Sequence, residues 1–279
     1  MARENHSLAA EFILIGFTNY PELKTLLFVV FSAIYLVTMV GNLGLVALIY
    51  VERRLLTPMY IFLGNLALMD SCCSSAITPK MLENFFSEDK RITLYECTAQ
   101  FYFLCLAETT DCFLLAAMAY DCYVAICNPL QYHTMMSKTL CIQMTAGAYL
   151  AGNLHPMIEV EFLLRLTFCG SHQINHFFCD VPAMLTLACT DTWVYESTVF
   201  LSSTIFLVLP FTGIACSYGR VLLAVYRMHS AEGRKKAYST CSTHLTVVSF
   251  YYAPFAYTYV RPRSLRSPTE DKILAVFYT

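Results

Sequence analysis

The sequence is poor in charge. Only 14% of its 279 residues are Asp, Glu, Lys or Arg, whereas an ordinary soluble domain carries roughly a quarter. At the same time 57% are hydrophobic, and the mean hydropathy is +0.53. This composition argues against a soluble globular domain and indicates an integral membrane protein built largely from helices.

Other features are missing as well. The net charge is −2 and no run of one sign dominates, so there is no electrostatic case for binding nucleic acid. We find no catalytic constellation, no glycine-rich phosphate loop and no convincing metal cluster, and therefore expect a non-enzyme without cofactor or metal. Residues 1–21 lack the basic-then-apolar start of a cleavable signal peptide, so the first membrane helix is expected to direct insertion.

The chain contains several long apolar segments. Residues 26–50 contain no charge over 25 positions, and a helix of about 20 residues crosses a bilayer. The pattern predicts one all-α domain of seven transmembrane helices, at about 26–50, 58–79, 97–127, 140–164, 196–226, 237–260 and 271–279. The seventh is expected to be incomplete, because nine residues at about 1.5 Å each cannot cross roughly 30 Å of hydrocarbon. A transporter or channel is disfavoured, because no inverted repeat or pair of broken helices is visible.

Polar side chains inside these segments need partners, because an unpaired polar group in a membrane is costly. Asn42 is expected to face other helices, and Asp70 to be neutral, paired or part of an ion site. Glu108 and Asp111 lie one turn apart and cannot both be charged cheaply. Either Glu108 lines a ligand cavity with Asp111 deeper in a switch, or both only hydrogen-bond to neighbouring helices.

Helical spacing groups further candidates in the third and sixth segments. Residues on one face of the third are Leu104, Glu108, Asp111, Cys112 and Leu115, with Cys105 and Thr109 on the adjoining edge. His244 is expected to be a hydrogen-bonded core residue with Asp111 as its partner, and protonation or metal binding there is the less favoured alternative.

The fourth segment carries polar residues near its outer end, which suggest that the helix ends early or faces a wet cavity. They are Asn153, His155, Glu159 and Glu161.

The segment 165–195 is a long loop of the kind that usually has a function. With Cys97, it places four cysteines in or beside polar loops, namely Cys97, Cys169, Cys179 and Cys189. Four cysteines on one side of a membrane fit two disulfides in an oxidising compartment. The same loop contains His172 and His176 between Cys169 and Cys179, which are zinc-type ligands; we favour the disulfide interpretation.

Several motifs carry a family resemblance. They are Pro58–Asp70, Met118–Cys127 (MAYDCYVAIC), His176–Asp180 and Lys236–His244. Together they resemble olfactory receptors, a family of rhodopsin-like, G-protein-coupled seven-helix receptors. Two positions depart from the family pattern: Cys122 stands where the family has arginine, and Tyr238 where it usually has phenylalanine.

The resemblance implies a rhodopsin-like bundle in the plasma membrane with an extracellular N-terminus at residues 1–25. It implies a small odorant as ligand and a stimulatory olfactory G protein as partner, acting through cyclic AMP. It also implies Cys97–Cys179 as the main disulfide, Cys169–Cys189 as a second, and Asp70 in a sodium and water pocket.

Residues are assigned on the same basis. We expect a ligand pocket between the outer halves of the third, fifth and sixth helices, lined by Leu104, Cys105, Glu108, Thr109, Ser202, Phe206, Phe255 and Tyr259, with Tyr252 at its floor. The cytoplasmic switch is expected at Asp121, Cys122, Tyr123, Tyr218 and His244.

Cys122 suggests an alternative interpretation of the function. In the family the arginine contributes a fixed charge and a fork of donors to the neighbouring aspartate and to the G protein. A thiol contributes neither, so a weakly coupling or non-signalling variant is a second interpretation, and a same-fold receptor for a non-odorant metabolite is a third.

Two signals disagree about orientation. With the N-terminus outside, eight of the 18 basic residues lie on the inner side and ten outside, which opposes the usual excess of positive charge inside. The sequon Asn5-His6-Ser7 and the four loop cysteines all fall outside in that orientation, and we give them more weight.

Glycosylation at Asn5 tests this orientation. We expect the chain expressed in mammalian cells to lose apparent mass on glycosidase treatment, because the sequon then faces the lumen during synthesis. The variant Asn5→Gln should be insensitive. An unglycosylated N-terminus that is accessible from the cytosol would contradict the orientation.

Overall fold

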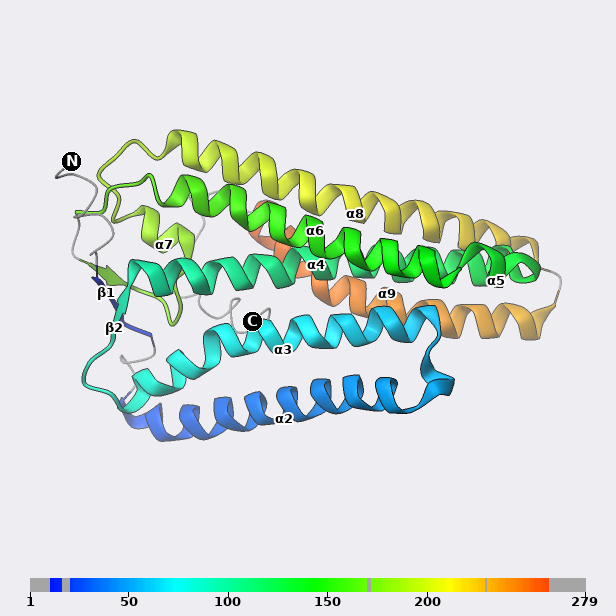
Figure 1. Ribbon diagram of the computed structural model, residues 1–279, viewed down its shortest axis with the longest axis horizontal. Coiled ribbons are helices and arrows are strands. Elements are labelled where there is room, and N and C mark those ends of the chain that lie inside the picture. Colours follow the sequence, from blue (N-terminus) through cyan, green and yellow to red (C-terminus); the bar gives the residue numbers. More distant parts are fainter. Residues whose placement is uncertain (1–10, 17–20, 170–171, 229, 261–279) are drawn as a thin grey trace.

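The computed structural model describes residues 11–16, 21–169, 172–228 and 230–260, with only the backbone described at 254–260. Within these ranges the long helices are α2 (Lys24–Val51), α3 (Pro58–Phe86), α4 (Leu94–Cys127), α6 (Lys138–Leu163), α8 (Trp193–Arg227) and α9 (Ala231–Val260). They run side by side along the long axis of the molecule (Figure 1). The expected segment 271–279 lies outside the described residues.

Short elements connect the long helices. The helical turns are η1 (Pro21–Leu23), η2 (Arg53–Leu55), η3 (Pro129–Gln131), α5 (Tyr132–Met135) and α7 (Val181–Leu185). The strands are β1 (Glu11–Leu14), β2 (Arg91–Thr93) and β3 (Gln173–Ile174). We call the end of the bundle that carries these strands the sheet end (Figure 1).

Some boundaries differ from those expected. The second helix does not stop at Pro79 but continues to Phe86, because neighbouring helices and local adjustment let a membrane helix tolerate a proline. The last long helix begins at Ala231, ahead of the expected start at residue 237. Helix α6 does not end early but reaches Leu163 with His155 and Glu159 buried.

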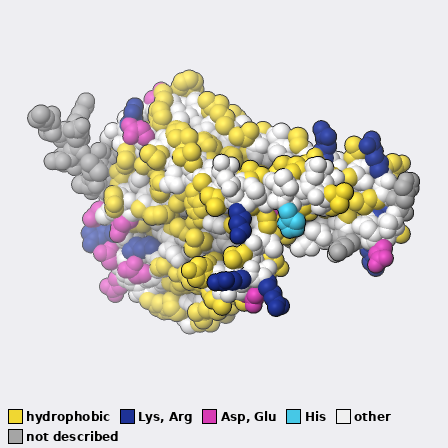
Figure 2. All heavy atoms as spheres, turned by 45° about the vertical axis from the view of Figure 1, so that its right-hand side comes forward, with side chains coloured by type: hydrophobic (Ala, Val, Ile, Leu, Met, Phe, Trp, Pro, Cys, Tyr) yellow, Lys and Arg dark blue, Asp and Glu magenta, His cyan; other side chains and the backbone are white. Residues whose placement is uncertain are grey.

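Among the helices of the described residues, four are long and apolar enough to cross a membrane: α2, α3, α4 and α8. Their outward faces carry large hydrophobic side chains, such as Val37 at 71% exposure and Phe200 at 63%. Figure 2 shows hydrophobic side chains spread over the side of the molecule that it displays. Such faces are favourable against lipid and costly in water.

Helix α4 occupies the middle of the bundle. Its most apolar window is 72% buried, whereas that of α2 is 0% buried. It packs against α3, α6 and α8 (Figure 1), and Leu114, Leu115 and Val124 are fully covered. Because α4 is enclosed, polar side chains on it must find their partners on neighbouring helices.

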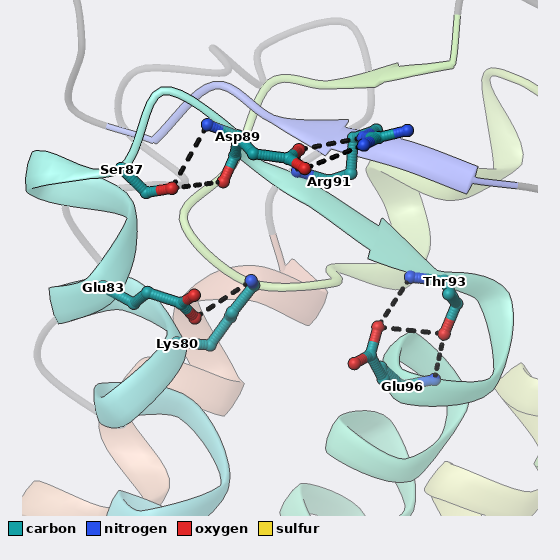
Figure 3. A network of polar contacts seen from close by, with 7 residues as sticks. All are labelled: Lys80, Glu83, Ser87, Asp89, Arg91, Thr93 and Glu96. Carbon is teal, nitrogen blue, oxygen red and sulfur yellow. Dashed lines mark hydrogen bonds and ion pairs between the residues drawn. The ribbon is translucent and has the colours of Figure 1, made fainter.

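The start of α4 is marked by a capping box (Figure 3). The Thr93 hydroxyl accepts a hydrogen bond from the Glu96 backbone N–H at 3.2 Å, and the Glu96 carboxylate accepts one from the Thr93 N–H at 2.8 Å. Just before it, Arg91 donates to Asp89, and these hydrogen bonds lower the pKa of that carboxyl to about 2. The pair therefore stays charged at physiological pH.

A small sheet covers the sheet end, which the all-helical expectation did not include. Its order is β2-β1-β3, with β1 antiparallel to β2 and parallel to β3. Strand β1 alternates exposed and buried residues, and Phe12 and Leu14 are 0% and 1% exposed. Their burial anchors the N-terminal strand to the two loops on either side of it.

Two disulfides join Cys97 to Cys179, which are buried with the inner side of this sheet, and Cys169 to Cys189, which are exposed. The Cα–Cα separations are 5.2 and 5.9 Å, within the usual range for a disulfide. Both pairings implied by the resemblance are thus present. The zinc interpretation of the loop is wrong, because both cysteines are oxidised and the His176 ring stacks on Phe177 at 4.7 Å instead.

Helices α4 and α6 approach closely at Gly152. A Cβ atom built on this residue would overlap the Thr110 hydroxyl and lie 3.0 Å from the Leu106 carbonyl oxygen, whereas one built on Gly147 of the same helix would meet nothing within 4 Å. The absence of a side chain at position 152 is therefore a packing requirement.

We expect Gly152→Ala to lower the free energy of unfolding by about 1–3 kcal/mol, because the methyl group overpacks the contact with α4. Thermal unfolding of the detergent-solubilised protein measures this. The matched control Gly147→Ala should leave the midpoint unchanged or raise it, since alanine is the better helix former by roughly 1 kcal/mol. Equal midpoints for the two variants would contradict the close contact.

Candidate functional site

A buried carboxylate, Glu159, joins three helices near the sheet end. It is only 2% exposed. Its Oε1 atom accepts hydrogen bonds from the Ser202 hydroxyl at 3.0 Å, the Ser203 hydroxyl at 3.1 Å and the His155 Nε2 atom at 2.8 Å. These donors come from α8 and α6, so a single oxygen atom holds the two helices together.

Helix α4 reaches the same carboxylate from the other side. The Cys105 thiol donates to Glu159 Oε2 over a long 3.8 Å, and Thr109 Oγ1 lies 2.7 Å from His155 Nδ1. Phe206 of α8 stacks on the His155 ring at 4.8 Å. We call this set the Glu159 cluster; its members are Cys105, Thr109, His155, Glu159, Ser202, Ser203 and Phe206.

The cluster brings together four of the residues expected to line the ligand pocket. They are Cys105, Thr109, Ser202 and Phe206, which come from two helices almost a hundred positions apart in sequence. Sequence reasoning singled out Glu159 as a polar residue of the fourth segment but did not connect it to these four residues. His155 and Glu159 stand at i and i+4, on one face of a helix, and that spacing was the available signal.

Glu108 belongs to a different region. Together with Asp111, Asp70 and Asn42 it lines a cavity of about 720 Å³ between α2, α3, α4 and α9. The Tyr251 hydroxyl donates to the Glu108 backbone carbonyl at 2.6 Å. Within the described residues, Asp111 Oδ1 is buried without a hydrogen-bond partner. The face expected from helical spacing therefore exists, but it looks toward this cavity and not toward Ser202.

The remaining expected pocket residues lie apart from both regions or outside the description. Leu104 is 6% exposed and packs in a cluster with Met69 and Phe178. Tyr252 lies in the central core, with its ring 5.3 Å from that of Phe211. The side chains of Phe255 and Tyr259 lie outside the described residues.

At the end opposite the sheet, the Met118–Cys127 motif closes α4. Asp121 is 4% exposed and its Oδ1 atom accepts a hydrogen bond from the Tyr132 hydroxyl of α5 at 2.7 Å. Burial, with the hydrogen bond to Asp121, raises the pKa of Tyr132, so the phenol keeps its proton and donates. Sequence reasoning missed Tyr132. Cys122 is buried at 3% exposure and Tyr123 is half-buried.

His244 does not pair with Asp111 as expected. Its Nδ1 atom lies 2.5 Å from the Tyr218 hydroxyl, and its Nε2 atom has no partner within the described residues. Tyr218 and His244 also stack, with ring centroids 5.7 Å apart. The expectation was wrong because the sequence does not show which residues of α4 and α9 lie at the same level along the bundle.

Metal chemistry finds no support in this geometry. Within the described residues, no three His, Cys, Asp or Glu side chains are arranged to hold a metal ion. The arrangement suits hydrogen bonding and apolar contact in a buried environment.

Comparison with known proteins places the chain in a family. Residues 31–276 match the sequence profile of the family described as "Olfactory receptor". Human Olfactory receptor 5K3 is 70% identical over 279 residues, covering 100% of this chain and 86% of that protein. Human Olfactory receptor 5K4 is 68% identical over 278 residues, with 100% and 86% covered.

The likeness extends to another species. Mouse Olfactory receptor 5K16 is 60% identical over 279 residues, covering 100% of this chain and 87% of that protein. These matches agree with the helical bundle, the outward apolar faces and the paired loop cysteines described above. The chain belongs to the olfactory receptor family, whose members are membrane-spanning, rhodopsin-like seven-helix receptors.

Proposed function

We propose that this chain is an odorant receptor that binds small, mostly apolar molecules between the outer halves of α4, α6, α8 and α9. Upon binding it activates a stimulatory olfactory G protein and raises cyclic AMP. The observation that carries the ligand site is the convergence of Cys105, Ser202 and, through His155, Thr109 on Glu159, beside the ring of Phe206. A few polar groups next to aromatic surface are typical of a small-molecule site.

Apolar contact supplies most of the affinity in this proposal. Burial contributes about 25 cal/mol per Å² of apolar surface, and one or two polar groups fix the orientation of the ligand. A ligand activates the receptor only if it binds the active arrangement more tightly than the resting one. Contacts on both α4 and α8 allow this, because a ligand that contacts two helices has a binding energy that depends on their relative position.

The proposed location is the plasma membrane with the sheet end outside. Strand β1 and both disulfides share that end, and disulfides form and persist in oxidising compartments. The end that carries Asp121, Tyr132 and the start of α9 then faces the cytosol, where a G protein would bind.

Replacing Phe206 by alanine tests the ligand site. We expect the affinity for an activating odorant to fall about tenfold or more, because losing the apolar contact between an aromatic ring and the ligand costs about 1.5–3 kcal/mol. The thermal stabilisation of the purified receptor by that odorant measures binding without requiring a G protein. The matched control is Phe200→Ala on the same helix, whose ring is 63% exposed to the surroundings and should not matter. Equal effects of the two variants would place the ligand elsewhere.

One observation favours a second candidate function, a weakly coupling member of the family. Cys122 is buried and carries no fixed charge, and Asp121 is held by Tyr132 from the neighbouring turn. A receptor with this switch binds odorants normally but transmits the binding poorly, because the donors that a guanidinium would present are absent.

We expect Cys122→Arg to raise odorant-driven cyclic AMP about tenfold or more, since a hydrogen bond to a charged group contributes about 1.5–3 kcal/mol. The assay compares this chain with a chimera carrying the C-terminal part of human Olfactory receptor 5K3, of which the chain covers 86%. The control Cys122→Ser keeps the size without the charge and should give no gain. An unchanged response to Cys122→Arg in both backgrounds would show that position 122 does not limit coupling.

A further inference from the structure

The hydroxyl hydrogens of the Glu159 cluster are already committed within the protein. The Ser202 hydroxyl has two acceptors in reach, Glu159 Oε1 at 3.0 Å and the Val199 carbonyl at 3.2 Å, and neither can donate in return. The Ser203 hydroxyl donates to the same Glu159 oxygen at 3.1 Å. Since each hydroxyl has one hydrogen, neither serine has a second one to offer.

The hydrogen bonds of Cys105, His155 and Thr109 also run toward Glu159. The Cys105 thiol points to Glu159 Oε2, and a carboxylate can only accept. The His155 Nε2 atom carries the hydrogen that reaches Glu159, so in the neutral ring Nδ1 accepts from Thr109. The hydrogens of the cluster are therefore directed toward Glu159, directly or through His155, and that of Ser202 is shared between Glu159 and the Val199 carbonyl.

After these hydrogen bonds have formed, the oxygen atoms of the cluster still have unused lone pairs. Each serine oxygen keeps two acceptor positions after donating its hydrogen. Among the described residues, the distant Cys105 thiol at 3.8 Å is the one hydrogen-bond partner of Glu159 Oε2. A ligand oxygen without a hydrogen would face these lone pairs and find no donor. A ligand that carries an O–H or N–H group would find acceptors.

We propose that Glu159, by drawing the hydrogens of Ser202, Ser203 and Cys105 to itself, makes the pocket a hydrogen-bond-accepting surface that selects alcohols over ketones of the same shape. The inference rests on the proposed odorant site and specifies its ligand class. Glu159 acts here as a positioning residue, because it sets the direction of the hydroxyls that meet the ligand.

Rigid alcohol and ketone pairs test this selection, since the two members differ little except in the polar group. Suitable pairs are menthol with menthone, borneol with camphor, and cyclohexanol with cyclohexanone. Binding is measured as thermal stabilisation of the full chain in lipid nanodiscs, titrated with each compound. We expect the alcohols that bind to be favoured about tenfold or more over their ketones, because a polar group without a partner in a buried site loses its hydrogen bond to water.

Two variants separate positioning from mere support of the fold. The amide of Glu159→Gln must donate as well as accept, so it turns at least one serine into an acceptor and frees a hydrogen for the ligand. We expect the alcohol preference to fall to about one or to invert. Ser202→Ala removes an accepting oxygen and should weaken the alcohols while leaving the ketones unchanged, which keeps the test valid if Glu159→Gln folds poorly.

The matched control is Glu161→Gln. It makes the same chemical change on the same helix, but Glu161 is exposed and pairs with Arg165, so the preference should not change. Ketones bound as tightly as alcohols by the unaltered chain, or a preference insensitive to both Glu159→Gln and Ser202→Ala, would overturn the inference while leaving odorant binding intact. Stabilisation by no compound of the panel would count against the ligand site itself, and the inference would fall with it.

Discussion

Helix α4 is packed against neighbours around most of its circumference, and the polar chemistry of the bundle follows from that constraint. No polar side chain on an enclosed helix can reach water easily, so each must be matched by a group on another helix or remain unsatisfied. Cys105 and Thr109 meet their partners, Glu159 and His155, on α6. Asp111, one turn further along and on another face, lines the cavity instead. Two regions of different character thus arise from neighbouring turns of one helix.

The Glu159 cluster shows how a buried carboxylate can be tolerated in such a place. Its oxygens are approached by two hydroxyls, an imidazole nitrogen and a thiol from three helices. Removing a single donor leaves the others, whereas removing the carboxylate would leave several buried groups unpaired at once. The same hydrogen bonds fix the relative position of α4, α6 and α8, so support of the bundle and selection of a ligand depend on one side chain.

How far the sequence alone leads differs from residue to residue. Apolar runs indicated the long helices, because a membrane span needs a minimum length whatever its partners. Helical spacing correctly separated Glu108 and Asp111 from Cys105 and Thr109, but it could not say which helix each face meets, because that depends on packing between distant segments. For this reason Asp111 was paired wrongly with His244, and Tyr132 and Glu159 were overlooked as the partners of Asp121 and Ser202. Strand β1 was missed because four alternating residues are too short a pattern.

The position of β1 in the middle of its sheet has a consequence for biosynthesis. Its two partners, β2 and β3, are made long after it, and four long helices, α2, α3, α4 and α6, lie between β1 and β3 in the sequence. Phe12 and Leu14 therefore stay exposed while those helices are inserted. The sheet can form completely only after the loop that carries Cys179 has reached the same side of the membrane. Strand β1 is the first described element of the chain, yet it is among the last to reach its final position.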